Sequence, residues 1–264
     1  MWLGILGPLT VTALGERDVP IGAAKQRAIL GALALEAGCV VSLRDLADSV
    51  WDGEPPANAQ TALRTYVARL RQTLGSELGA MIRTAHGGYV LSAGEQDVDA
   101  LMFERLCRSG QAFSAAGDWR RAAEDLHRAL ALWRGSPLSD AGSNRLRCRA
   151  AGRWEEPRLQ ALQTRIEADL RLGRHQRALN DLCFLTSRFP LHEPFYGQLM
   201  VAYFRSDRRG EALRTFQHAR TTLLEKVGIE PGRQLYALRH RIMNSDPALL
   251  SAQSPSRDPR LTSE

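Results

Sequence analysis

The chain has 264 residues, 44% of them apolar and 24% charged, which is typical of a globular protein with one or two domains. No apolar run approaches the ~20 residues of a membrane span. Residues 1–11 lack the basic flank of a signal peptide, so we expect a cytoplasmic protein with no membrane partner. The four cysteines are scattered without a C-x-x-C pair, which favours free thiols over disulfides or a metal site.

The net charge of +6 is unevenly distributed along the chain. Residues 1–94 hold eight basic and eight acidic side chains, whereas residues 95–264 hold 27 and 21. Within the first part, however, the stretch from Thr61 to Ser92 contains four arginines and only one acid, Glu77. This local separation indicates a polyanion-binding surface better than the net charge does.

The first fifty residues predict a small β structure followed by two helices. The expected elements are strands at Leu3–Val11 and Val19–Ile21, a turn at Gly15–Asp18, and helices at Ala23–Ala37 and Leu43–Val50. Ser42 and Asp45 fit a capping box at the start of the second helix.

A third helix is predicted from Asn58 to Gly75, with Asn58 as its cap and Gly75 as its end. Its apolar residues repeat at helical spacing and define one buried face: Leu63, Val67, Leu70 and Leu74. The opposite face carries Thr61, Thr65, Ala68, Arg69 and Gln72, flanked by Arg64 and Arg71. Arginine reaches guanine edges or phosphates and a threonine methyl contacts thymine, so this face suits a major groove.

A β-hairpin is predicted next, from Met81–His86 and Tyr89–Ser92 joined by Gly87-Gly88. Its polar, basic and aromatic residues are Arg83, Thr84, His86 and Tyr89, as expected of a wing beside a phosphate backbone. The alternative is a solvated basic helix followed by an ordinary surface hairpin.

Strands, three helices and a hairpin in this order describe a winged helix-turn-helix, and the order resembles the OmpR type. Four segments carry a closer resemblance: GPLTV, KQRAILGALAL, LADSVWDGEPPANAQTALRTYVARLRQTLG and GGYVL. They are similar to the Streptomyces antibiotic regulatory proteins, which activate biosynthetic gene clusters. The resemblance covers nearly the whole chain and includes that family's second part, the bacterial transcriptional activation domain.

The resemblance implies that the third helix enters the major groove and that the wing contacts the adjacent backbone. By position, Thr61, Thr65 and Arg69 would face bases, and Arg64, Tyr66 and Arg71 would lean on phosphates. The wing would contribute Arg83, Thr84, His86 and Tyr89. The chain departs from the family pattern at Ala68, at Gln72 and at residues 84–86, so the target sequence does not follow from the resemblance.

From about Val98 the sequence predicts helices without strands and an internal repeat. RLGRHQRAL at 171–179 and RSDRRGEAL at 205–213 are 34 residues apart, and residues 115–133 resemble an earlier copy. A 34-residue period is that of tetratricopeptide repeats, although generic antiparallel helices are the alternative. The predicted organisation is an α+β DNA-binding domain at 1–93, an all-α repeat domain at 94–250 and a disordered tail at 251–264.

Motifs of catalysis are missing from the sequence, including a P-loop, G-x-S-x-G and H-E-x-x-H. We therefore expect neither an enzyme nor a catalytic residue, and neither a metal nor a cofactor.

The expected partner is double-stranded DNA, bound at direct repeats by a homodimer, together with RNA polymerase. Trp51, Asp52 and Glu54 form an aromatic and acidic loop that suits a basic face of sigma factor region 4 or the alpha subunit. The alternative for Trp51 is that it fills the core. Two other functions remain open: a tetratricopeptide adaptor whose winged domain no longer binds DNA, and a regulator that senses a metabolite on its helical repeats.

Overall fold

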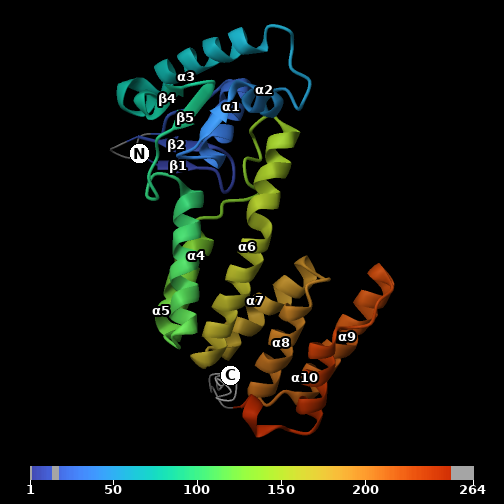
Figure 1. Ribbon diagram of the computed structural model, residues 1–264. Coiled ribbons are helices and arrows are strands. Elements are labelled where there is room, and N and C mark those ends of the chain that lie inside the picture. Colours follow the sequence, from blue (N-terminus) through green and yellow to red (C-terminus); the bar gives the residue numbers. More distant parts are fainter. Residues whose placement is uncertain (1, 14–17, 251–264) are drawn as a thin grey trace, which may run out of the picture. The chain divides into compact units, whose positions relative to one another are not determined.

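The computed structural model describes residues 2–13 and 18–250 (Figure 1). These residues divide into two compact units, one from 2–109 and 127–161 and the other from 110–126 and 162–250. The predicted tail Ser251–Glu264 and most of the predicted turn at Gly15–Asp18 lie outside the described residues. None of the described helices is long and apolar enough to cross a membrane.

The first unit begins with two small sheets and three helices in the predicted order. These elements are β1 (Trp2–Gly4), β2 (Thr10–Thr12), α1 (Ala24–Leu35), β3 (Val40–Ser42), α2 (Leu43–Val50), α3 (Ala59–Met81), β4 (Ile82–Ala85) and β5 (Gly88–Leu91). β1 and β2 pair antiparallel, and the second sheet has the order β3-β5-β4. The winged helix-turn-helix architecture predicted from the sequence is confirmed.

The N-terminal strand prediction needs a correction. Leu3–Val11 is not one strand but two, β1 and β2, which pair with each other. The cause is a buried carboxylate: Asp99 accepts hydrogen bonds from the backbone N–H groups of Ile5 at 2.7 Å and Leu6 at 3.0 Å. These bonds hold the turn between the two strands. Val19–Ile21 forms no strand; an isolated bridge joins Thr12 to Asp18 just before it, and the Val19 N–H donates to the Val11 carbonyl at 2.8 Å.

Asp99 begins α4 (Asp99–Ala115) and is fully buried. Burial raises the pKa of its carboxyl, while the two backbone N–H groups and Arg134, at 3.2 Å, favour the charged form. Loss of this carboxylate would leave two backbone donors without partners. The N-terminal strands therefore depend on a residue that lies beyond the predicted DNA-binding domain.

A third strand, β3, was not predicted, because Val40–Ser42 is too short to give a pattern. It pairs with β5, with Val41 opposite Tyr89 and Ser42 opposite Gly88. Any side chain at Gly88 would meet the Val41 carbonyl oxygen, since a Cβ there would lie only 2.0 Å from it. Gly87 has a φ of 78°, a conformation that favours glycine, and it makes the turn. Gly88 is needed instead for the close pairing of β5 with β3.

The first two helices, α1 and α2, follow their predicted ranges closely. α2 has the predicted bounds, and its Ser42 hydroxyl accepts the Asp45 N–H at 3.1 Å, which confirms the predicted cap. α1 is slightly shorter than predicted. The core between the helices is built from the expected apolar face, with Leu33, Leu46 and Leu63 fully buried.

The second unit is all helical. It contains α7 (His175–Arg188), α8 (Glu193–Arg205), α9 (Arg209–Val227), α10 (Arg233–Met243) and the short η1 (Pro247–Leu249). It also takes in parts of α4, of α5 (Trp119–Ala131) and of α6 (Asn144–Arg171).

The 34-residue repeat predicted from the sequence is visible in the packing. Ala178 and Ala212, which are 34 residues apart, are both fully buried. Leu182 and Phe216, also 34 residues apart, have at most 1% of their surface exposed. The turns recur as well: the Arg174 N–H donates to the Asp169 carbonyl, and the Arg208 N–H donates to the Tyr203 carbonyl. Each pair of helices therefore packs and turns in the same way as the next.

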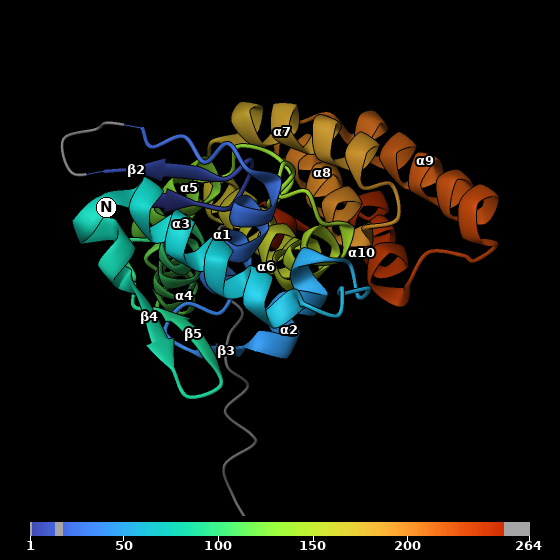
Figure 2. The ribbon, with the colours of Figure 1, turned by 90° about the horizontal axis from the view of Figure 1, so that it is seen from above.

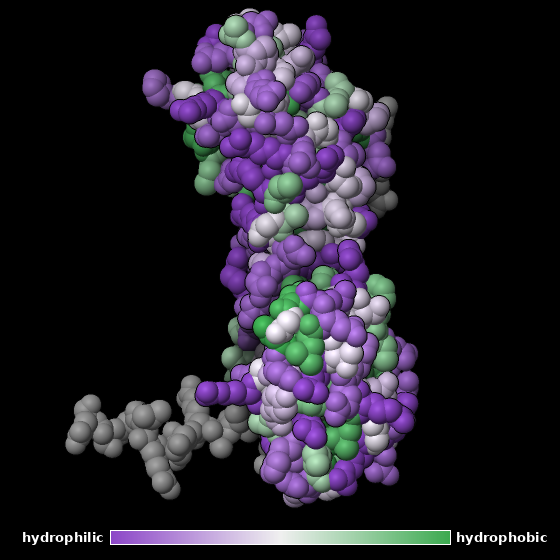
Figure 3. All heavy atoms as spheres, turned by 90° about the vertical axis from the view of Figure 1, so that its right-hand side faces the viewer, coloured by the Kyte–Doolittle hydropathy of each residue, from purple (hydrophilic) through white to green (hydrophobic). Residues whose placement is uncertain are grey.

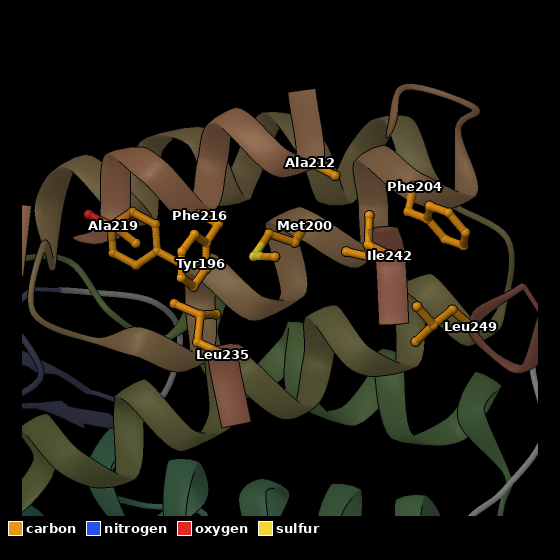
Figure 4. Close-up of a cluster of buried hydrophobic side chains, with 9 residues drawn as sticks. All are labelled: Tyr196, Met200, Phe204, Ala212, Phe216, Ala219, Leu235, Ile242 and Leu249. Carbon is orange, nitrogen blue, oxygen red and sulfur yellow. The ribbon is translucent and has the colours of Figure 1, made fainter. Parts of the chain in front are cut away.

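The core of the last repeats joins α8, α9 and α10 (Figure 4). Tyr196 and Met200 come from α8, Phe216 from α9, and Leu235 and Ile242 from α10. At the surface this unit also exposes large apolar side chains, among them Phe184, Leu191, Val227 and Ile229, and green areas mark its surface in Figure 3. The rest of the face shown in Figure 3 is mostly polar and purple.

Candidate nucleic-acid interface

α3 is held by its apolar face, which leaves the opposite face open. Leu63, Val67 and Leu70 are fully buried and pack toward α1 and α2. Thr61, Arg64, Thr65, Arg69 and Gln72 are exposed, as the helical spacing predicted. Figure 2 shows α3 lying across the unit, with the β4–β5 hairpin extending beyond it.

Two arginines of this face are uncommitted. Within the described part of the chain, Arg64 and Arg69 make neither an ion pair nor a side-chain hydrogen bond. The Thr65 hydroxyl, in contrast, donates to the Thr61 carbonyl at 3.1 Å, which leaves the threonine methyl and an oxygen lone pair for an outside partner. The face thus presents two guanidinium groups and a small apolar contact, a combination that can read base edges.

Arg71 is used differently from its neighbours. Its Nε and one terminal nitrogen donate to the Ile82 carbonyl at 3.0 and 2.8 Å, and the same terminal nitrogen donates to the Thr84 hydroxyl at 3.0 Å. The guanidinium also lies over the Tyr89 ring, 5.6 Å from its centre. Arg71 therefore fixes the hairpin to α3, a positioning role that the sequence did not suggest.

The hairpin presents fewer contact residues than expected. Tyr89 was predicted at the exposed tip, but it is 6% exposed because it lies on β5 beneath Arg71. Thr84 is exposed while its hydroxyl accepts from Arg71. Arg83 and His86 are exposed, and Arg83 Nε donates to the Ser92 hydroxyl at 2.6 Å. The accessible charge of the wing is thus carried mainly by Arg83.

The regular helix ends at Gly75, as predicted, and the chain bends there before a second helical segment that completes α3. Gly75 has φ 79° and ψ −179°, and helical residues continue to Met81. A side chain at Gly79 would collide with the Arg71 carbonyl oxygen, because a Cβ would lie 2.5 Å from it. The bend and this close contact bring the end of α3 back toward β4.

The loop after α2 makes more contacts within the fold than its composition suggested. Trp51 is half-buried, 6.3 Å from the Tyr66 ring and beneath the Lys25 ammonium at 5.3 Å. Tyr66, predicted to lean on a phosphate, is half-buried in the same contact. Its aromatic face therefore supports the loop.

Asp52 caps a helix from a distance. One of its carboxylate oxygens accepts from the Ser143 hydroxyl at 2.6 Å and from the Arg145 N–H at 2.9 Å, at the start of α6. The Ser143 hydroxyl in turn accepts the Leu146 N–H at 3.2 Å. The hydrogen bond from Ser143, the largest cause, lowers the pKa of Asp52. Glu54 remains exposed, and among the described residues only its backbone takes part in a hydrogen bond.

Sequence reasoning missed this link between the loop and α6. The local signal was present, since a serine three residues before Leu146 fits a helix cap. The partner of Ser143 could not be predicted from sequence spacing, because Asp52 lies 91 positions away from it. Among residues 2–13 and 18–250, no three His, Cys, Asp or Glu side chains gather as a metal site.

Both parts of the chain match known protein families. Residues 19–91 match the family described as "Transcriptional regulatory protein, C terminal", and residues 98–243 match "Bacterial transcriptional activator domain". The regulatory protein DnrI of Streptomyces peucetius is 38% identical over 94% of both chains. The transcriptional regulator RedD of Streptomyces coelicolor is 38% identical over 97% of this chain and 74% of its own.

A solved structure of Mycobacterium tuberculosis EmbR, in complex with a low-affinity phosphopeptide, has the same fold. Its TM-score is 0.89 at 32% identity, over 95% of this chain and 66% of that one. The chain belongs to the Streptomyces antibiotic regulatory protein family, with an OmpR-type winged helix and a bacterial transcriptional activator domain. It is a DNA-binding transcriptional activator.

Proposed function

We propose that the protein activates a secondary-metabolite gene cluster by binding direct repeats beside a promoter and contacting RNA polymerase. The observation that carries this proposal is the open face of α3, where Arg64 and Arg69 have no partner among the described residues. A guanidinium left exposed on a helix that is otherwise firmly packed is available to guanine or phosphate.

We assign roles by accessibility. Thr61, Thr65 and Arg69 would face bases, and Arg64, Arg83 and His86 would contact phosphates. Arg71, Thr84, Tyr66 and Tyr89 would act by positioning, because their side chains are engaged within the fold. Residues 1–93 would supply these contacts, and residues 94–250 would form the activation domain. The compact first unit also includes residues 127–161, which belong to the second of these domains in sequence.

An operator made of two direct repeats would bind two copies of the protein. A tandem arrangement places each α3 in a major groove on the same side of the duplex, with half-sites separated by about 10.5 bp per helical turn. The predicted homodimer would then form on DNA. Sedimentation of the protein with and without a two-site duplex distinguishes dimerisation on DNA from dimerisation before binding.

For polymerase, Glu54 is the best candidate in the loop after α2. Asp52 caps α6 and Trp51 packs on Tyr66, so these two shape the loop and leave Glu54 as its exposed acid. A basic surface on sigma factor region 4 or the alpha subunit is the complementary partner.

The test combines binding and transcription. Gel-shift and footprinting on upstream regions near the gene should give protected tandem repeats next to a −35 element, and the purified protein should raise transcription from that template in vitro. Weak, sequence-blind binding without added transcription would contradict the proposal. A scrambled repeat of the same length is the matched control for salt-dependent, nonspecific binding.

A further inference from the structure

A groove in the second unit lies outside the DNA-binding surface. It has a volume of about 470 Å³ and is formed by the first helices of successive pairs, α6, α8 and α10. This volume is in the range of sites for small molecules. Its apolar lining includes Val201, Leu235 and Leu238. Its charged lining is Glu167, which is paired with Arg171 at 2.7 Å, together with Glu193 and Arg233.

The groove is open because α8 has a glycine in its interior. A Cβ at Gly197 would lie 3.7 Å from both Leu235 Cδ1 and Leu238 Cδ2, at ordinary contact distance, so alanine would fit. Glycine weakens a helix interior relative to alanine, so no local requirement explains it. Its effect on the fold is to leave free space above the two leucines.

One side of the groove offers a fixed carboxylate. Glu193 is the first residue of α8, and its Oε2 accepts the Gly232 N–H at 2.8 Å. This bond orients the carboxylate, and Oε1 has no hydrogen-bond partner among the described residues. The free oxygen can accept from an ammonium group.

The positive charge of the groove is at the start of α10, directly after the Gly232 that Glu193 contacts. Arg233 is exposed and pairs with no carboxylate in the described part of the chain. Its backbone N–H and that of Gln234 fall in the first turn of the helix, where intrahelical acceptors are lacking. The guanidinium and these N–H groups together favour a carboxylate.

We propose that this groove binds a small zwitterionic molecule of the amino-acid type with an apolar side chain. The ligand carboxylate would meet Arg233, its ammonium would meet Glu193, and its side chain would lie over Leu235 and Leu238. Two opposite charges beside one apolar floor select a molecule that carries both charges and an apolar group. The proposal is independent of how the first unit contacts DNA.

The test is calorimetric titration and thermal unfolding of the full chain with leucine and leucyl-leucine. N-acetyl-leucine lacks the ammonium and leucinamide lacks the carboxylate, so each should bind at least tenfold more weakly than the better zwitterion. Tighter binding of leucyl-leucine than of leucine would assign the site to short peptides, and the reverse order would assign it to free amino acids. No heat and no shift in Tm with any of the four probes would overturn the proposal.

Variants locate the site. Gly197→Leu fills the groove and should abolish binding, whereas Gly197→Ala should raise the Tm of the free protein and reduce binding only partly.

The charged residues are tested separately. Arg233→Gln, at a position that is exposed and unpaired among the described residues, should weaken the binding of leucine at least tenfold and leave the binding of leucinamide unchanged. Glu193→Gln keeps an acceptor for the Gly232 N–H and should weaken ligands that carry an ammonium. Binding that survives both Gly197→Leu and Arg233→Gln would place the ligand elsewhere and refute the assignment.

Discussion

The exposed face of α3 and the loop after α2 look equally suited to outside partners in the sequence, but the fold treats them differently. On α3, Arg64 and Arg69 stay free among the described residues. In the loop, Trp51 packs on Tyr66 and Asp52 caps α6. A polar residue in a candidate surface is therefore evidence of a contact only once its partners within the chain are known.

The same contrast runs through α3 itself. Arg69 and Arg71 are two residues apart, yet the first is uncommitted and the second makes three hydrogen bonds to the hairpin. Substitutions at these positions should separate base reading from wing positioning.

Arg69→Ala should weaken binding to the cognate operator by about 1–3 kcal/mol and relax specificity at one base pair, because a base-reading guanidinium is removed. Fluorescence anisotropy on cognate and random duplexes measures both effects. The Tm should not change, since Arg69 has no partner in the described fold. An equal loss on both duplexes would make Arg69 a phosphate contact instead.

Arg71→Ala should lower the free energy of unfolding by about 1–2 kcal/mol, because the hydrogen bonds to Ile82 and Thr84 and the contact with Tyr89 are lost. DNA binding should fall on every sequence as the wing loosens. The matched control is Arg64→Ala, which should keep the wild-type stability and reduce the salt slope by about one unit. If Arg71→Ala behaved like Arg64→Ala in both assays, its positioning role would be refuted.

Asp52→Ala should cost about 1 kcal/mol of stability, as loss of a helix cap does, without affecting DNA affinity. The sign of its pH dependence follows from the lowered pKa of Asp52. This part of the stability is present above the unfolded pKa, near 3.8, and is lost as the pH falls through the folded value. Urea unfolding of wild type and Asp52→Asn across this range should show the acid-dependent part only in wild type.

Glu54→Ala should leave stability within about 0.5 kcal/mol of wild type, as expected for an exposed side chain. DNA affinity should also be unchanged, while transcription in vitro falls. Because Asp52 caps α6, the double substitution of both acids would mix folding with recruitment, so the single variant is the sharper test. Unchanged transcription with Glu54→Ala would remove the loop from polymerase contact.

What could be predicted from the sequence was what depends on local spacing. The apolar positions of α3, the bounds of α2 with its Ser42 cap and the 34-residue period all follow from periodicity or nearby residues. The errors came from long-range contacts. Asp99 divides the first strand, and Arg71 covers Tyr89, through partners that sequence spacing does not reveal.

The central claim is that α3 reads the major groove, and methylation interference tests it most directly. Guanines methylated at N7, which faces the major groove, should block binding within each half-site, and the guanine opposite Arg69 should lose its effect in Arg69→Ala. Interference confined to adenine N3, in the minor groove, would contradict the account and leave α3 without its proposed role.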